Sequence, residues 1–133
     1  MTKGTTYNNI NLIVDTLLND FGKLMSDSYG NYFCQKHFKV ISADQRLSIL
    51  NAISDNFVKI SCDAMGTHSM QRLIELVSED EERMVIYNSI QHNVGHLAFH
   101  HKGNFVLLTI VSHVMKGPLG NQLLGCIIEK LLP

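Results

Sequence analysis

The sequence is poor in proline, in long apolar runs and in net charge. No apolar run approaches the roughly 18 residues that a membrane span requires, and no basic segment leads into an apolar one at the N-terminus. We therefore expect a soluble chain with no membrane partner and no secretory leader. The net charge of −1 also argues against a nonspecific nucleic-acid binder, because such proteins are strongly basic.

Cysteine is scarce as well. The three cysteines, Cys34, Cys62 and Cys126, are odd in number, lie in apolar stretches and form no CxxC pair. We therefore expect a reducing, cytoplasmic location and neither a disulfide framework nor a zinc site. The sequence has no nucleophile elbow, phosphate loop or HExxH motif. For this reason we expect neither an enzyme nor a small-molecule cofactor.

What the sequence does contain is a repeat marked by glycine. Gly30, Gly66 and Gly103 each open a stretch with the same kind of side-chain triplet, and they lie 36 and 37 residues apart. Periods of this length are typical of stacked helical solenoids. Apolar residues around the glycines keep the same register, and their spacing of three and four residues defines one face of a helix. The aligned sets are Phe21, Phe57 and Val94; Leu24, Ile60 and Leu97; Cys34, Met70 and Leu107; Phe38, Ile74 and Val111; and Ile41, Val77 and Val114.

Glycine breaks and capping signals predict three helices in each repeat. A short first helix ends before the glycine, a longer second helix follows it, and a third helix begins at a capping signal. Ser42 with Gln45 and Ser78 with Glu81 match the S-x-x-E/Q capping box, and the proline after Gly117 marks the start of the last third helix. The predicted first helices are 20–26, 56–62 and 93–99, and the predicted second helices are 31–40, 67–77 and 104–114.

Full repeats are expected at 19–53, 54–90 and 91–127 of one domain that covers residues 1–133. Residues 10–18 align with the third helix of a repeat, so that residues 1–18 are expected to be the end of a preceding repeat or a cap. Residues 128–133 are expected to start a following repeat. Because a solenoid needs polar caps at its ends, we expect the chain to be part of a longer array or to associate with itself.

The residues directly after each glycine are the candidate binding residues. Positions i and i+4 of a helix share a face, and position i+1 lies about 100° round the axis. Amide groups can match the edge of a nucleobase, and a flat ring can stack on its face. This geometry suits the insertion of one base per repeat. The three sets are Asn31, Tyr32 and Gln35; Thr67, His68 and Gln71; and Asn104, Phe105 and Leu108.

These segments resemble Pumilio-family (PUF) repeats over nearly the whole chain. Residues 30–36, Gly-Asn-Tyr-Phe-Cys-Gln-Lys, are very similar to the family's recurrent G-N-Y-x-x-Q-K, and residues 66–72 are a variant of it. The resemblance implies an all-α, right-handed α-solenoid of three-helix repeats, similar to armadillo and HEAT superhelices. It also implies selective binding of single-stranded RNA in the 3′ untranslated regions of messages. Effector proteins on the convex face would then act in post-transcriptional regulation of translation or mRNA decay.

Position by position, the resemblance implies that Asn31 and Gln35 contact a base edge while Tyr32 stacks, a combination that the family associates with uracil. Thr67 departs from the residues that the family usually has at its position. The identity of the base at the second repeat is therefore not fixed, and Gln71 with His68 allows uracil or adenine. Because the family binds RNA antiparallel to its repeats, the expected order is 5′-N-(A/U)-U-3′.

The third repeat departs further from the family's pattern. Leu108 cannot form a hydrogen bond with a base edge. We expect this repeat to stack a base on Phe105, with weak selectivity through Asn104 alone.

Alternative readings of the same residues stay open. The motif side chains could be helix caps and packing groups only. The departures at Thr67 and Leu108, with the lack of a basic surplus, favour a helical-repeat scaffold that holds a protein partner. His92, His96 and His100 are spaced four apart, and on one helix face three histidines could hold zinc.

Charged residues give weaker indications. Lys36, Arg72 and Lys102 lie near the motifs and are expected to neutralise RNA phosphates. The acidic run at residues 79–82 is expected to be a solvated helix start that the helix dipole favours. Recognition would then depend more on stacking than on charge.

Overall fold

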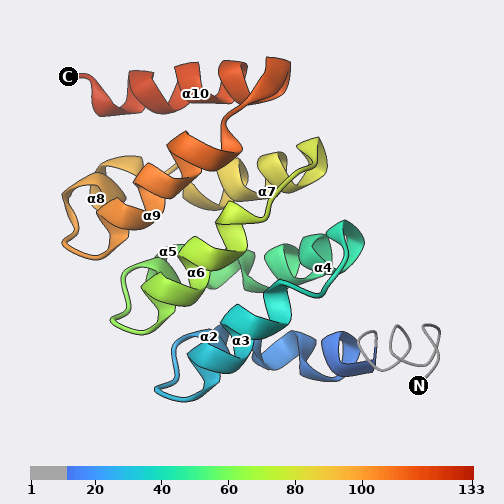
Figure 1. Ribbon diagram of the computed structural model, residues 1–133. Coiled ribbons are helices and arrows are strands. Elements are labelled where there is room, and N and C mark those ends of the chain that lie inside the picture. The colour runs from blue at the N-terminus through green and yellow to red at the C-terminus, as the bar shows by residue number, and fades with distance from the viewer. Residues whose placement is uncertain (1–11) are drawn as a thin grey trace.

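The chain folds into stacked layers of helices, which a computed structural model describes for residues 12–133 (Figure 1). Every regular element within these residues is helical, and none of them is a strand. The layers follow one another in chain order, and each repeats the arrangement of the layer before it. The predicted all-α solenoid is therefore confirmed. None of the helices formed by residues 12–133 combines the length and the apolar character that a membrane crossing requires.

Each layer contains a short first helix, a second helix and a third helix. The layers are α2 (Phe21–Met25), α3 (Gly30–Phe38) and α4 (Ala43–Ile53); α5 (Phe57–Ser61), α6 (Gly66–Glu75) and α7 (Asp80–Ile90); and α8 (Val94–Phe99), α9 (Gly103–Thr109) and α10 (Gly117–Leu131). Residues 12–17 are helical and lead through the 3-10 turn η1 (Leu18–Asp20) into α2. The 3-10 turn η2 (Ser54–Asn56) precedes α5 in the same way. Residues 10 and 11 of the helix predicted over 10–18 lie outside the described residues.

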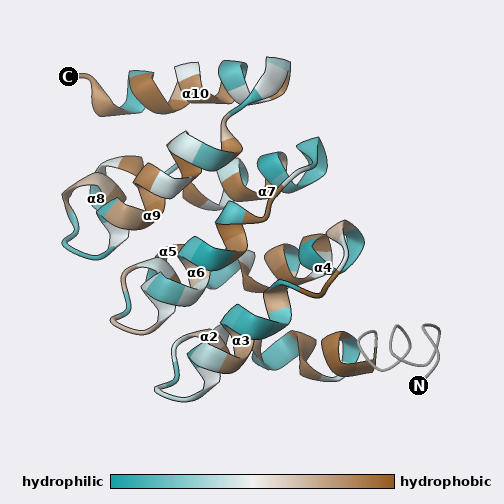
Figure 2. Cartoon of the chain, viewed as in Figure 1, coloured by the Kyte–Doolittle hydropathy of each residue, from teal (hydrophilic) through white to brown (hydrophobic). Residues whose placement is uncertain are grey.

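One apolar core runs through the layers, and the predicted register is confirmed within it. Apolar and polar segments alternate along the helices, as an amphipathic pattern requires (Figure 2). Fully buried residues come from all three helix positions, such as Phe57, Met70 and Ile86. Among the residues aligned from the sequence, Leu24 and Val111 are only half-buried.

Glycine opens each second helix because the end of the first helix lies too close for a side chain. A Cβ at Gly30 would lie 2.6 Å from the carbonyl oxygen of Leu24. A Cβ at Gly103 would lie 2.9 Å from Leu97 Cδ2 and 3.0 Å from the sulfur of Cys62. These distances are much shorter than those of a favourable van der Waals contact. The glycines therefore let the first and second helices pack at their closest approach.

The third helices begin at capping boxes, one of which differs from the prediction. The box at Ser42 is confirmed, since its Oγ accepts from the backbone N of Gln45 at 3.2 Å and the Gln45 side chain accepts from Ser42 N at 2.8 Å. The box predicted at Ser78 is wrong, because α7 has Glu79 as its N-cap and Glu82 as its third residue. α6 has 10 residues and α3 has 9, and this additional residue moves the start of α7 by one.

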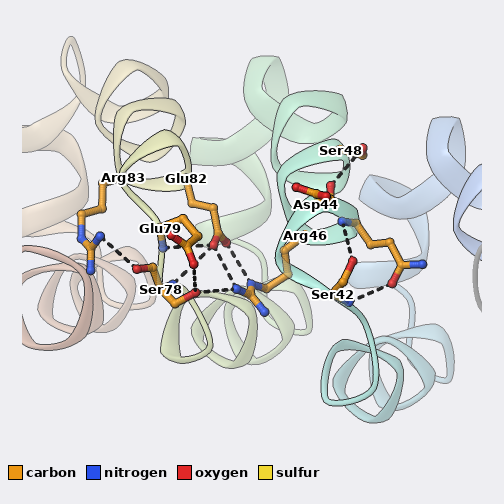
Figure 3. Close-up of polar contacts among 9 residues, drawn as sticks. Ser42, Asp44, Arg46, Ser48, Ser78, Glu79, Glu82 and Arg83 are labelled. Carbon is orange, nitrogen blue, oxygen red and sulfur yellow. Dashed lines mark hydrogen bonds and ion pairs between the residues drawn. The ribbon is translucent and has the colours of Figure 1, made fainter.

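A buried ion pair joins α4 to α7 at this point (Figure 3). Arg46 donates through Nε and Nη2 to the two carboxylate oxygens of Glu82, both at 2.9 Å. Nη2 also donates to Ser78 Oγ at 3.1 Å, so that this hydroxyl group contacts the preceding repeat instead of capping α7. The prediction that residues 79–82 form a solvated helix start is wrong for Glu82, which is fully buried.

Two helices at the C-terminal end also differ from the prediction. The helix expected over 104–114 divides into α9 and the π-helical turn η3 (Ile110–Val114). The Val114 carbonyl oxygen accepts from Arg83 Nε at 2.8 Å, which turns this end of the helix toward the preceding repeat. The start of α10 at Gly117 is as predicted, but α10 continues unbroken through 128–131, where a separate first helix was expected. Residues 128–131 contain good helix formers and no turn residue, so nothing ends the helix there.

Candidate nucleic-acid interface

The three second helices lie next to one another and present flat side chains on one surface. α3 packs against α6, and α6 packs against α9. The second residue after each motif glycine points outward in every case. Tyr32 is 63% exposed, Phe105 is 51% exposed and His68 is also exposed. Rings at the repeat spacing can accept bases between them.

The residues directly after the motif glycines, which we call the first position of the motif, lie below this surface. Asn31 and Thr67 are each only 2% exposed. Asn31 Nδ2 donates to the carbonyl oxygens of Asp27 at 2.7 Å and Ser28 at 3.0 Å. Thr67 Oγ1 donates to the carbonyl oxygen of Lys102 in the next repeat at 3.3 Å. Both side chains therefore tie the start of their helix to nearby backbone, and the direct base contact expected of Asn31 is not open in this conformation.

The fifth-position glutamines are the amides that a ligand can reach. Gln35 Nε2 donates to Asn31 Oδ1 at 3.1 Å, and Gln71 Nε2 donates to Thr67 Oγ1 at 3.1 Å. In both repeats the side chains at these two positions lie side by side, as their spacing predicts. A primary amide has a second N–H and a carbonyl oxygen, so each glutamine keeps a donor and an acceptor for a base edge.

A hollow of about 150 Å³ lies between α3 and α6 at these glutamines. It is lined by Gln35, His68, Gln71, Arg72 and Glu75. Arg72 forms an exposed ion pair with Glu75 at 3.1 Å, so that the cation predicted to meet a phosphate already has a partner. The lining combines amides, an imidazole and paired charges, which are groups that can contact the edge and the face of a base.

The third repeat has a different surface. Leu108 is 58% exposed, and it lines an apolar groove of about 520 Å³ between α9 and α10. Asn104 is half-buried, and its Nδ2 donates to the carbonyl oxygen of His100 at 2.8 Å. In this motif Phe105 offers an exposed ring and the half-buried Asn104 an amide, whereas Leu108 offers only apolar surface.

The loops before the second helices are fixed by side chains that sequence reasoning missed. Asp27 accepts from the backbone N of Tyr29 at 2.9 Å and of Gly30 at 2.7 Å, and these two hydrogen bonds hold the pKa of its carboxyl below the ordinary value. Asp63 accepts from the equivalent amides in the second repeat at 2.9 and 2.8 Å. His100 stands at the aligned position of the third repeat. The sequence signal for this loop-fixing role was the alignment of Asp27 with Asp63.

The zinc alternative depended on three histidines that share one helix face, and this arrangement is wrong. α8 begins at Val94, so His92 lies in the preceding turn, and His100 follows the end of the helix in an extended conformation. Among residues 12–133, no group of three or more metal-binding side chains is placed to hold an ion.

Comparison with known sequences decides the family. The sequence model of the Pumilio-family RNA binding repeat (PUF) matches residues 20–54 and 56–90, which together make up more than half of the chain. The chain belongs to the Pumilio family. The matched PUF repeats contain α2 to α4 and α5 to α7.

Known PUF proteins share both sequence and fold with this chain. Pumilio homolog 12 of Arabidopsis thaliana is 32% identical over 111 residues, which are 81% of this chain and 19% of that protein. A Puf4 mutant bound to a Cox17 RNA 3′ UTR recognition sequence has a TM-score of 0.83 at 25% identity, with 96% of this chain and 42% of that chain covered. The Puf4 RNA binding domain bound to an HO endonuclease RNA 3′ UTR recognition sequence gives 0.82 at 28% identity, with 92% and 36% covered. This PUF array thus spans about a fifth of the curated relative's length.

Proposed function

We propose that this chain binds single-stranded RNA, with one base held at each second helix. The observation that carries the proposal is the repeated surface of α3, α6 and α9. Tyr32, His68 and Phe105 are exposed at the same position of successive repeats, and the hollow beside Gln35 and Gln71 lies between α3 and α6. Membership of the Pumilio family supports the same assignment.

In the first repeat, a base stacks on Tyr32 and meets the amide of Gln35, which Asn31 orients from below. Asn31 contacts the base only if its side chain leaves the backbone carbonyl groups that now hold it. The family association of this combination with uracil gives the first repeat a preference for that base. The second repeat uses His68 and Gln71, with Thr67 in the orienting position, and takes uracil or adenine.

The third repeat contributes stacking with little selectivity. Phe105 provides the ring, and Asn104 provides the one amide, because Leu108 offers no hydrogen bond. The RNA then reads 5′-N-(A/U)-U-3′ along the array.

The cellular role proposed for the chain is post-transcriptional regulation in the cytoplasm. Puf4 is bound to 3′ UTR recognition sequences in the two structures compared above, and this chain shares its fold. RNA bound on the second helices would leave the outer helices open to effector proteins that control translation or mRNA decay.

Fluorescence anisotropy tests the binding directly. Labelled oligouridine and a UGU-containing RNA are titrated with the wild type and with the double variant Tyr32→Ala/Gln35→Ala. Both residues lie outside the core, so we expect the variant to lose RNA binding while its melting temperature stays close to that of the wild type. Duplex RNA should compete poorly, because its bases cannot enter between the rings.

A matched control variant separates a site effect from a general one. His92→Ala/Gln122→Ala removes a ring and an amide from exposed positions in the turn before α8 and on α10, outside the second helices. We expect it to bind RNA as the wild type does. Equal loss in both variants would exclude base reading at the first repeat, and absence of binding in all three proteins would favour a scaffold for protein partners.

A further inference from the structure

In the loop before each second helix, the first side chain accepts two hydrogen bonds from the backbone of the loop. Asp27 and Asp63 each accept hydrogen bonds from the backbone N–H groups two and three residues further on. In the third repeat, His100 Nδ1 accepts from the backbone N of Lys102 and Gly103, both at 3.0 Å. An imidazole thus replaces a carboxylate in the same role.

This role fixes the protonation state of the histidine. Nδ1 can accept two N–H groups only in the neutral ring with its proton on Nε2. A proton on Nδ1 would turn the acceptor into a donor that faces two other donors. A carboxylate at the same position has no such restriction between about pH 5 and pH 8.

The loop that His100 holds leads directly into the base-contacting residues of α9. The carbonyl oxygen of His100 accepts from Asn104 Nδ2 at 2.8 Å. Phe105 is the next residue, and its backbone N donates to the Lys102 carbonyl oxygen at 3.2 Å. A change in the hydrogen bonds of His100 therefore reaches both Asn104 and Phe105 through the first turn of α9.

We propose that His100 is a positioning residue whose protonation releases the third repeat from RNA while the first two repeats keep their hold. This inference rests on the proposed function for its RNA effect. The structural half, that protonation of His100 loosens the start of α9, stands independently of RNA. The third repeat thereby becomes sensitive to pH in a range where the aspartates of the other repeats are not.

The neighbours of His100 increase the effect of its protonation, because His96, His101, Lys102 and Cys62 offer no negative charge to balance the added proton. The ring of His96 on α8 lies 5.8 Å from that of His100, and the ring of His101 lies 4.6 Å from it. Lys102 belongs to the same loop, and Cys62, at the end of α5, faces it beside Gly103. Burial raises the pKa of the Cys62 thiol, so that this group stays neutral and offers no compensating charge.

The direction of the pH effect follows from the pKa of His100. Burial, with smaller contributions from His101 and His96, holds this pKa below the ordinary value of 6.5. A lowered folded-state pKa means that the unfolded chain binds the proton first as the pH falls. The stabilising contribution is therefore complete above about pH 6.5 and is lost as the pH falls from there through the folded-state pKa.

The test compares wild type with His100→Asp, which restores the side chain used in the other two repeats. NMR follows the amide signals of residues 102 and 103 and the histidine ring signals from about pH 7.5 to about pH 5. We expect the wild-type amides to shift and exchange faster with the titration of His100. In His100→Asp we expect them to stay constant. Amides that do not change with the His100 ring in the wild type would overturn the proposal.

RNA binding is measured over the same pH range. We expect the affinity of the wild type for oligouridine to fall by about tenfold relative to His100→Asp, as weakened stacking of one base predicts. His68 and His37 are present in both proteins, so the comparison isolates His100. His92→Asp is the matched control, because it adds the same charge at an exposed position in the turn before α8, and it should follow the wild type.

The outcomes distinguish the two proposals. Parallel pH profiles of RNA affinity in wild type and His100→Asp would overturn the link to RNA. If none of the proteins binds RNA at any pH, the proposed function fails. The amide signals then still decide whether His100 controls the start of α9.

Discussion

At the scale of single residues, this array assigns different tasks to chemically similar side chains. Asn31 and Gln35 both carry amides one helical turn apart, but Asn31 is buried and holds the loop, whereas Gln35 borders the hollow. The difference arises because the shorter side chain reaches the carbonyl groups at the start of its own helix. The longer one extends past them to the surface.

His37 shows the cost of a polar residue in an apolar position. It is buried on α3, where the other repeats have Leu73 and Ile110, and its ring stacks against Phe33 at 5.4 Å. Its Nε2 has no hydrogen-bond partner among the described residues. Burial lowers the pKa of His37.

We expect His37→Leu to raise the free energy of unfolding by about 1–2 kcal/mol near pH 7.5, because a buried unsatisfied polar atom is removed. The gain should be larger near pH 5.5. The unfolded chain takes up a proton at His37 before the folded chain does, so stability falls with pH below about 6.5 in the wild type. Urea denaturation at the two pH values measures both effects.

An exposed histidine provides the control for this substitution. His113→Leu should change stability by less than about 0.5 kcal/mol at either pH. An equal dependence of stability on pH in wild type and His37→Leu would contradict the assignment of a buried, neutral His37.

At the scale of helices, adjacent repeats are joined on their third helices by arginines that reach forward. Arg46 of α4 pairs with Glu82 of the next repeat, and Arg83 of α7 donates to the Val114 carbonyl oxygen of the repeat after that. Arg46 thus reaches the first turn of the following third helix, and Arg83 reaches the segment that precedes α10. These contacts set the spacing of the layers on the outer side, while the second helices face the proposed RNA site.

Arg46→Ala should destabilise the protein by about 3–5 kcal/mol, because it leaves the Glu82 carboxylate buried without its partner. Replacing both residues, as in Arg46→Met/Glu82→Leu, should cost far less than the single change, since no charge remains in the interior. Chemical denaturation of the single and double variants measures the coupling between the two residues.

The exposed pair of Arg72 and Glu75 gives the comparison. Arg72→Ala should cost no more than about 1 kcal/mol, because solvent screens this pair. If Arg46→Ala is as mild as Arg72→Ala, the ion pair between α4 and α7 does not hold the repeats together.

At the scale of the whole molecule, the number of repeats and the charge limit RNA affinity. Stacking contributes about 1–3 kcal/mol per base, so three bases give roughly 3–9 kcal/mol before the strand is ordered. Micromolar binding requires about 8 kcal/mol net. The chain by itself is therefore expected to bind weakly.

We expect a dissociation constant above about 1 µM and a shallow dependence on salt. The three cations near the motifs, Lys36, Arg72 and Lys102, would give a slope of log affinity against log salt of about −2 at most. Anisotropy titrations at several salt concentrations measure it. A much steeper slope would mean that binding is dominated by phosphate contacts and not by base stacking.

The sequence alone determined the architecture of this protein. The period, the apolar register and the glycine that opens each second helix recur along the chain, and the first two follow from local rules that need no distant partner. The caps at Ser42 and Gly117 and the exposed positions of Tyr32 and Phe105 could be predicted for the same reason. Helical geometry places these side chains wherever the helix forms.

Only the tertiary structure decided which polar groups are buried. Glu82 lies in an acidic run that resembles a solvated helix start, but its partner Arg46 is 36 residues away. Thr67 bonds to backbone 35 residues further along, and His100 acts as a loop anchor because the chain turns back on it. Periodicity does not encode the contacts of Glu82 and Thr67, since both depend on how one layer is placed against the next. The pairing of charges between repeats therefore had to be read from the stacked repeats.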